Sequence, residues 1–379
     1  MSFCKYRYCK IMNSLGFDKS ESDTKVVVAM SGGVDSSVAA VMLKKKGYNV
    51  TGITLRLYNS SNVSKNKSCC AGIDIEDAKK VASQNDIKHI VLDYQDKFFD
   101  GVINNFVDSY SNGETPLPCV KCNQTVKFKD LLNEAKKMGA DALVTGHYAI
   151  RKGNLTNASL HKAIDKNKDQ SFFLFATLQE QLNFVRFPLG NYKKSEIRKI
   201  AEKYKLNVSN KPDSQDICFV TSDSYRNLIN NINPNANKEG NIYDIYGKII
   251  GVHKGITNYT IGQRKGLGVS GFKDPLYVID INKKLNSIIL GPKEKLKRNT
   301  ISFKNINWLG GEIIPKKLHC SAKIRSTQQD LPGVLDITDN VGTFSFHSDL
   351  DGTSPGQACV FYNKDQFGYK VLGGGWIKE

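Results

Sequence analysis

The chain has 379 residues, of which 40% are hydrophobic, and this is enough for two or three domains with packed cores. No apolar stretch is long enough to cross a membrane, so we expect no membrane partner. The formal net charge of +17 indicates a polyanionic partner, with nucleic acid as the first candidate. A lysine-rich surface that serves no such partner is the alternative.

Residues 1–24 precede the first expected strand and are predicted to form an N-terminal extension. This stretch begins with basic residues but has no long apolar segment, so a short arm is favoured over a secretory signal; an organelle transit peptide is a further alternative. The chain has nine cysteines, an odd number that argues for a reducing compartment rather than a framework of disulfides. We therefore expect a cytoplasmic protein.

Residues 25–224 alternate between strand and helix patterns. Strands are predicted at Val26–Met30, Tyr48–Leu57, His89–Tyr94 and Asp141–Thr145. Helices are predicted at Val34–Lys46, Ile75–Gln84, Phe98–Tyr110, Thr125–Met138 and Lys194–Tyr204. This alternation predicts an α/β domain with a doubly wound parallel sheet, whose ligands bind at the carboxyl ends of the strands.

The pattern changes after residue 224. Residues 225–295 are rich in glycine and in short β-like runs, so we expect a small β-rich central domain. Residues 296–379 contain short alternating segments, including Leu318–Ile324, Gly342–Phe346 and Ala358–Tyr362, which are typical of a small β-barrel.

A glycine loop connects the first predicted strand and helix. Its sequence, Ala29 to Ser36, is Ala-Met-Ser-Gly-Gly-Val-Asp-Ser, so the candidate residues are Ala29, Met30, Ser31, Gly32, Gly33, Val34, Asp35 and Ser36. Backbone N–H groups at such a helix start can bind phosphate, and Ser36 and Ser37 are expected to cap the helix. The lysine of a Walker A loop is missing, and the loop resembles that of the PP-loop ATP pyrophosphatases. That resemblance implies that it holds the pyrophosphate that leaves ATP; an ordinary glycine turn is the alternative.

Cys119 and Cys122 form a Cys-x-x-Cys pair before the predicted helix Thr125–Met138. A zinc half-site needs two more ligands, for which only the adjacent Cys69 and Cys70 are available, and a thioredoxin-type pair fits its position poorly. A single nucleophile, Cys122, is favoured, because a helix N-terminus and nearby lysines stabilise a thiolate. Cys218, taken alone, is interpreted as a buried structural cysteine. Together with the glycine loop, a second cysteine and a basic chain, it becomes a candidate persulfide carrier.

Several further motifs follow in order and, together with these, resemble the tRNA-specific 2-thiouridylases from about Lys25 to the C-terminus. They are Cys69-Cys70 with Asp77-Ala78; Thr115 to Asn123 with Lys127-Phe128; Thr145 to Tyr148; Lys168 to Ser171; Phe187 to Gly190; Ser214 to Phe219; Tyr259 to Gly266; and Pro355 to Ala358. The resemblance implies ATP-dependent thiolation of the wobble uridine to 2-thiouridine.

The resemblance also assigns residues. Cys122 is implied as the nucleophile and Cys218 as the persulfide carrier, with a Cys122–Cys218 disulfide formed in passing. ATP is implied to bind at Ala29–Ser36, with Leu55 and Gly146 beside the adenosine, and Asp35 is a candidate ligand of Mg²⁺. The central domain and a set of separate residues are implied to bind tRNA: Leu117, Pro118, Cys119, His147, Lys168, Asp169, Gln170, Arg325, Ser326 and Gln357.

The implied partners are tRNAs for lysine, glutamate and glutamine and a protein that donates persulfide sulfur. Members of the family often have asparagine at the position of Leu117 and an aromatic residue at that of Ser326, so those two contacts are in doubt. Some members have an acidic residue at the position of Cys119, and no catalytic role is assigned to this cysteine. Two other functions remain open: a PP-loop ligase for a small metabolite, and a nucleic-acid-binding module with a vestigial loop.

Overall fold

The computed structural model describes residues 12–58, 72–213, 217–220 and 225–378. Cys69 and Cys70, together with Ser214 to Asp216 of the Cys218 motif, lie outside the described residues. No helix in the described ranges is both long and apolar enough to span a membrane.

The first domain is built on a five-stranded, fully parallel sheet with the strand order β3-β2-β1-β4-β7. The strands are β1 (Lys25–Ala29), β2 (Asn49–Arg56), β3 (Lys88–Asp93), β4 (Ala142–Val144) and β7 (Val185–Arg186). Successive valines of β1 point to opposite faces of the sheet, and all three are buried. Val26 and Val28 pack into one hydrophobic cluster and Val27 into another, so both faces of the sheet are covered. The predicted doubly wound sheet is confirmed.

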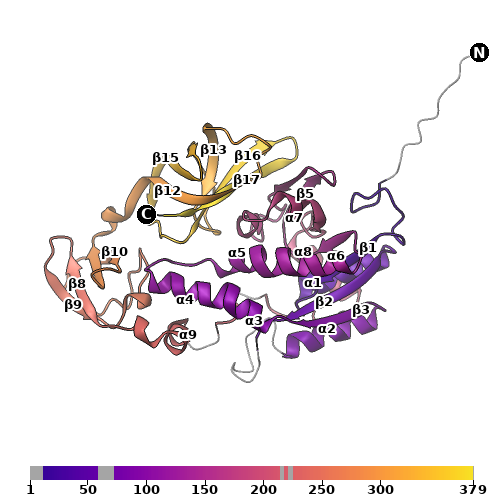
Figure 1. Cartoon of the computed structure of the whole chain (residues 1–379), viewed down its shortest axis with the longest axis horizontal. Coiled ribbons are helices and arrows are strands. Elements are labelled where there is room, and N and C mark those ends of the chain that lie inside the picture. The colour runs from indigo at the N-terminus through magenta and orange to yellow at the C-terminus, as the bar shows by residue number, and fades with distance from the viewer. Residues whose placement is uncertain (1–11, 59–71, 214–216, 221–224, 379) are drawn as a thin grey trace, which may run out of the picture.

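Helices cover both faces of this sheet (Figure 1). On one face lie α1 (Val34–Lys45), α2 (Gly72–Gln84) and α8 (Lys194–Lys203). On the other face, one long helix runs through α3 (Gln95–Phe98), η2 (Phe99–Ile103) and α4 (Asn104–Ser111). A second long helix runs there through α5 (Pro118–Cys122), η3 (Asn123–Leu131) and α6 (Leu132–Lys137), beside the short helix α7 (Gln179–Phe184).

The predicted start of that second helix is wrong. The sequence pattern places it at Thr125, but the helix begins at Pro118. Proline is favoured in the first helical position, because its ring presets the helical φ and its missing N–H is not needed there. The Cys-x-x-Cys pair therefore lies within the helix rather than before it.

Residues 13–24 pack against the parallel sheet. Leu15 and Phe17 are buried, the Arg186 guanidinium lies over the Phe17 ring, and Arg186 Nε donates to Leu15 O. Lys19 forms an ion pair with Asp141. From residue 13 onward, this part of the expected extension is integral to the first domain.

The central region starts with α9 (Tyr225–Ile232) and contains a four-stranded sheet in the order β10-β11-β8-β9. Its strands are β8 (Gly240–Asp244), β9 (Ile249–His253), β10 (Tyr277–Asn282) and β11 (Ser287–Gly291), and Ile242, Val278, Ile288 and Leu290 form the centre of its core. The predicted β-rich character is confirmed.

The C-terminal region is a six-stranded antiparallel barrel, as predicted. Its strands are β12 (Lys297–Trp308), β13 (Lys317–Lys323), β14 (Leu331–Thr338), β15 (Val341–Asp351), β16 (Ala358–Asp365) and β17 (Gly368–Ile377), and the β12–β17 pairing closes the barrel. Phe303, Phe344 and Phe361 pack in its interior. A hairpin of the first domain, β5 (Ile150–Gly153) and β6 (Ala158–His161), extends the sheet through β17.

The three regions meet around the segment between α4 and α5 (Figure 1). Thr115 in this segment exchanges hydrogen bonds with the barrel: its N–H donates to Pro355 O and its O accepts from Gln357 Nε2. Lys283, in the turn between β10 and β11, donates to Asn112 Oδ1 at the end of α4. Contacts with both later regions therefore fix the segment that leads to Cys119 and Cys122.

Candidate active site

The glycine loop lies at the carboxyl end of β1, where parallel sheets of this kind bind ligands. Gly32 has φ of +72°, and a Cβ at this position would lie 2.1 Å from Asp74 O, so only glycine fits. The Ser31 N–H donates to Ser36 Oγ at 3.0 Å, and this bond folds the loop back on the first turn of α1. The loop thus brings the open N-terminus of α1 to the strand ends.

The expected cap by Ser36 or Ser37 is wrong. Gly33 is the N-cap of α1, and no side-chain hydrogen bond caps the helix. Ser36 Oγ instead bonds within the loop, to Ser31 and to Gly33 O. The N–H groups of the first turn are therefore not taken by a capping side chain, as an anion-binding helix start requires.

The two residues expected beside the adenosine flank the loop. A Cβ on Gly146 would lie 2.8 Å from the Ser36 N atom, so the strand end after β4 approaches the start of α1 very closely. Leu55 is buried in β2, next to β1 in the sheet, and the nearby Thr54 hydroxyl donates to Met30 O at 2.8 Å. The contacts of these residues with a nucleotide stay predictions.

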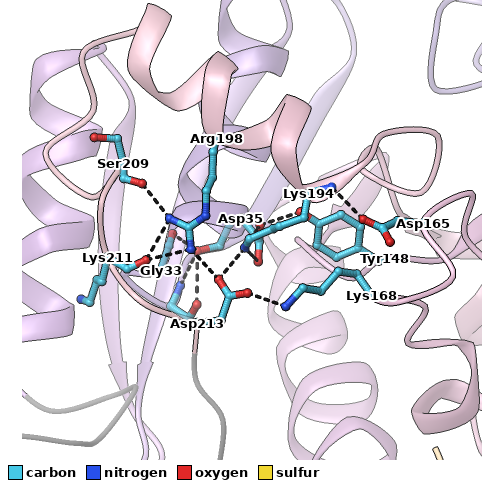
Figure 2. A network of polar contacts seen from close by, with 12 residues as sticks. Gly33, Asp35, Tyr148, Asp165, Lys168, Lys194, Arg198, Ser209, Lys211 and Asp213 are labelled. Atoms are coloured by element: carbon cyan, nitrogen blue, oxygen red, sulfur yellow. Dashed lines mark hydrogen bonds and ion pairs between the residues drawn. The ribbon is translucent and has the colours of Figure 1, made fainter. Parts of the chain in front are cut away.

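Asp35 of the loop is the start of an ion-pair network that the sequence does not reveal (Figure 2). Lys194 Nζ lies 2.7 Å from both Asp35 carboxylate oxygens, and the Tyr148 hydroxyl donates to Oδ1 at 2.8 Å. Lys194 Nζ also lies 2.8 Å from Asp213 Oδ1. Asp213 in turn pairs with Lys168 at 2.7 Å and with Arg198 at 3.0 Å. The sequence contains these acidic and basic residues after the loop, but no motif indicates which of them form ion pairs.

A second ion cluster holds the other side of the loop. Lys211 Nζ donates to Gly32 O at 3.0 Å and pairs with Asp74 at 2.6 Å and Asp77 at 2.7 Å. Although burial works in the opposite direction, hydrogen bonds to Asp74 and Asp77 raise the pKa of Lys211. Lys211 therefore stays charged and links the loop to α2.

Cys119, Cys122 and Cys218 lie in different environments. Cys119 is exposed in the first turn of α5, whereas Cys122 is buried one turn further on. Cys122 belongs to the hydrophobic cluster on one face of the sheet, and Cys218 and Ala29 pack against that same cluster. The Tyr58 hydroxyl donates to Cys218 O at 3.0 Å. The two cysteines, 96 positions apart in the chain, thus lie on the sheet face that the start of the loop also contacts.

The sequence-based reason for a reactive Cys122 needs correction. The effect of a helix N-terminus on a thiol is confined to the first turn, and that turn contains Cys119 rather than Cys122. Lys121 and Lys129 lie on the same long helix as Cys122. A π-helical segment, Asn123–Leu131, begins directly after Cys122, and such segments often occur at functional sites.

The residues expected to contact the target base are arranged around this helix start. Pro118 is buried and Leu117 is half-buried next to the exposed Cys119. The half-buried His147 ring accepts or donates a hydrogen bond at Thr145 Oγ1 (2.9 Å), and burial lowers the pKa of His147 to about 3. His147 is therefore a neutral group at physiological pH.

The segment of Lys168, Asp169 and Gln170 is tied into the protein by hydrogen bonds. Gln170 Oε1 accepts from Tyr148 N, and its N–H donates to Tyr148 O. Asp169 accepts from Ala163 N and from Ser171, and burial raises its pKa. Lys168 pairs with Asp213, so each of the three residues has a structural contact whether or not it also meets tRNA.

The last three expected tRNA contacts lie on the barrel. Arg325 is exposed and donates to the carbonyls of Asp351 and Gly352, with the half-buried Ser326 beside it. Gln357 directs its amide to Thr115 O at 3.0 Å. None of these contacts tests the expected tRNA binding, which stays a prediction.

The Asp35 carboxylate, as placed, is a poor fit for a metal ligand, because Lys194 lies against both of its oxygens. Within the described ranges no group of three or more His, Cys, Asp or Glu side chains could hold a metal ion. Mg²⁺ commonly binds through one or two carboxylates and substrate phosphates, so Asp35 becomes available only if Lys194 moves away.

A parallel sheet covered on both faces, with a Ser-Gly-Gly-Val-Asp-Ser loop at the end of β1, defines an α/β protein of the PP-loop type. Three family models match in succession: a tRNA methyl transferase HUP domain at residues 24–222, a tRNA methyl transferase PRC-barrel domain at 227–292 and an aminomethyltransferase beta-barrel domain at 298–377.

Curated relatives match almost the whole chain. The tRNA-specific 2-thiouridylase MnmA of Roseobacter denitrificans is 48% identical over 97% of this chain and 98% of its own length. The proteins of the same name from Orientia tsutsugamushi and Rickettsia canadensis are 50% and 52% identical, over 96% and 93% of this chain and 98% and 95% of their own lengths. The chain belongs to the tRNA-specific 2-thiouridylase family.

Proposed function

We propose that this protein converts the wobble uridine of tRNA to 2-thiouridine with consumption of ATP. The observation that carries the proposal is identity of about half of the residues, over nearly the full length, to proteins named tRNA-specific 2-thiouridylase. Support from the fold comes from the loop at the end of β1 and from two cysteines on one face of the same sheet. The proposed substrates are ATP and tRNA, and the products are AMP, pyrophosphate and thiolated tRNA.

The first proposed step activates the base. The C2 oxygen of the uridine attacks the α-phosphate of ATP, the bond from this phosphorus to pyrophosphate breaks, and an adenylated base results. N–H groups at the start of α1 and the loop from Ser31 to Ser36 bind the leaving pyrophosphate. A wobble base lies in a single-stranded loop, so turning it toward Pro118 and His147 costs little.

The second proposed step delivers sulfur. The terminal sulfur of a Cys218 persulfide attacks C2, and AMP leaves with the former C2 oxygen. The Cys122 thiolate then attacks Sγ of Cys218. The bond between this Sγ and the sulfur attached to C2 breaks, and its electron pair stays on the sulfur of 2-thiouridine. The resulting Cys122–Cys218 disulfide is returned to two thiols by an external thiol reductant, and a persulfide-bearing donor protein reloads Cys218.

Mg²⁺, when bound with ATP, neutralises charge on the phosphate oxygens. Because Asp35 faces Lys194 in this conformation, we assign no step to the metal. The neutral His147 is suited to hold the base by a hydrogen bond, because it has no charge to repel or attract at the reacting carbonyl. Lysine, glutamate and glutamine tRNAs are the proposed acceptors.

The test incubates the full chain with ATP, Mg²⁺, a persulfide donor and unmodified tRNA, and quantifies 2-thiouridine, AMP and pyrophosphate. We expect all three products from the native protein and no 2-thiouridine from Cys122→Ser or Cys218→Ser. Cys320→Ala, which changes a buried cysteine of the barrel, is the control and should retain thiolation. Product from either serine variant would refute the assigned pair.

Two outcomes separate the alternatives. With a PP-loop ligase for a small metabolite, tRNA would not stimulate ATP cleavage and no 2-thiouridine would form, and neither cysteine would be needed. A binding module with a vestigial loop would form no AMP under any of these conditions. The near-complete match to the 2-thiouridylases disfavours both.

A further inference from the structure

Asp213 joins parts of the molecule that the proposed reaction uses in different steps (Figure 2). Its Oδ1 pairs with Lys194, which also holds Asp35 of the glycine loop, and its Oδ2 pairs with Lys168 of the expected tRNA-binding segment. Asp213 precedes Cys218 by five positions in the chain. One carboxylate thus connects Asp35 of the glycine loop, through Lys194, with Lys168 of the expected tRNA-binding segment.

We propose that Asp213 is a positioning residue that couples activation of the base to sulfur delivery from Cys218. This inference rests on the proposed thiolation reaction and adds to it a residue without contact to the reacting atoms. Asp213 would hold its own position in the chain, five residues before Cys218, at a fixed place relative to the loop that binds the pyrophosphate. The adenylated base and the persulfide would then meet in one arrangement.

The geometry supports a specific role for the carboxylate, because the rest of its segment is held independently. Arg198 donates to Ser209 O at 2.9 Å and to Lys211 O at 3.2 Å, and Lys211 is itself anchored by Asp74 and Asp77. Removal of the Asp213 charge therefore leaves the segment attached up to residue 211. The link from Lys168 through Asp213 and Lys194 to Asp35 is what such a change breaks.

The burial and the charges of these residues make the ion pairs of this link strong. Lys194 is buried, so its charge is poorly solvated and needs carboxylate partners. Three cations, Lys168, Lys194 and Arg198, lie within 3.0 Å of Asp213. Hydrogen bonds to charged groups at such distances are about twice as strong as neutral ones.

The test compares Asp213→Asn with the native protein by the amount of 2-thiouridine formed per pyrophosphate released in a single turnover, because pyrophosphate leaves when the base is activated and AMP leaves only when sulfur attacks. The amide keeps the size of the side chain but pairs poorly with three cations. We expect pyrophosphate release in the presence of tRNA to stay within a few-fold of native, whereas 2-thiouridine per pyrophosphate falls about tenfold, which corresponds to about 1.4 kcal/mol. Asp213→Glu, which restores the charge, should recover most of the ratio.

A matched control is available in Asp141→Asn. Asp141 also pairs with a lysine and is similarly exposed, with 19% side-chain accessibility against 20% for Asp213, but it lies at the other end of the parallel sheet. The control should leave the ratio unchanged. An Asp213→Asn variant with an unchanged ratio, or with pyrophosphate and 2-thiouridine reduced in proportion, would overturn the inference.

Failure of the proposed function is distinguishable from failure of this inference, because the native protein itself would then form no 2-thiouridine. If Asp213→Asn does not fold, Lys168→Met removes the tRNA-side half of the same link and is measured in its place. A normal ratio in folded Lys168→Met would count against the inference, and a lowered ratio would support it.

Discussion

The Gln357 amide of the barrel donates a hydrogen bond of 3.0 Å to Thr115 O, in the segment that enters the helix of Cys119 and Cys122. Pro355 O accepts from Thr115 N at 2.7 Å, so the barrel holds both backbone groups of this residue. Parts of the chain 242 positions apart are joined at the entrance to the cysteine helix. The barrel therefore helps to set the position of Cys122.

We expect Gln357→Ala to lower the turnover of tRNA thiolation more than the affinity for tRNA. The hydrogen bond that it removes is worth about 0.5–1.5 kcal/mol, which is a factor of about 2–12 in rate if all of it acts on the position of the helix. Single-turnover thiolation and tRNA binding by filter retention separate the two effects. The exposed Gln329→Ala is the control on the same barrel, and a pure reduction of tRNA affinity in Gln357→Ala would contradict the positioning role.

Gly32→Ala should eliminate ATP cleavage and destabilise the first domain. The new Cβ would lie 2.1 Å from Asp74 O, and backbone atoms cannot rotate aside. Gly16→Ala is a matched control, because Gly16 also has positive φ, +83°, but nothing lies within 4 Å of its Cβ. We expect about 1–2 kcal/mol of destabilisation in the control from φ alone, and clearly more in Gly32→Ala, by urea denaturation.

Binding of tRNA should weaken steeply with salt, and part of that dependence should come from the central region. Residues 225–295 contain eleven Lys and Arg but only five Asp and Glu. Replacing the exposed Lys284 and Lys295 by glutamine should reduce the slope of log K against log salt by about 0.7–0.9 for each phosphate that the protein no longer neutralises. The equivalent change of the exposed Lys45 and Lys46, at the end of α1 away from the loop, should leave the slope as it is.

The contribution of Asp213 to stability should depend on pH. Burial acts in the opposite direction, but hydrogen bonds from Lys168 and Lys194 lower its pKa from 3.8 to about 2. Since the folded state has the lower pKa, this stabilisation is complete above about pH 4 and disappears as the pH falls toward 2. The difference in unfolding free energy between the native protein and Asp213→Asn should therefore be constant from about pH 7 to about pH 5 and shrink below about pH 4. A difference that grows on acidification would contradict this assignment.

Much of the fold is predictable from the sequence because its signals are local. The strand Lys25–Ala29, the glycines after it and the apolar helix of Val34–Lys45 follow one another directly, and each has its own pattern. The start of the helix that contains Cys119 and Cys122 is harder to predict. The helix begins at Pro118, and proline is common in loops as well as in the first helical turn.

The site is predictable only in part, because its ion pairs join distant positions. Asp35 and Lys194 are 159 positions apart, and neither residue has a neighbour in sequence that indicates the other. The pairing of β6 with β17 is similarly non-local, and no periodicity around His161 or Lys370 could indicate it. The motifs predict the positions of the loop and the cysteines. The charged residues around the loop are brought there by the packing of α1 against α8, which the motifs do not predict.

The hairpin that joins the first domain to the barrel makes the two mutually dependent. Strand β17 pairs with β16 and β12 of the barrel and also with β6 of the first domain. A chain that ends after the first domain would lack β17, so the edge of β6 that pairs with it would have unsatisfied backbone groups. Such an edge is a template for pairing between copies. A fragment that ends near residue 224 should thus aggregate, and heat should melt the catalytic half and the barrel in one cooperative transition.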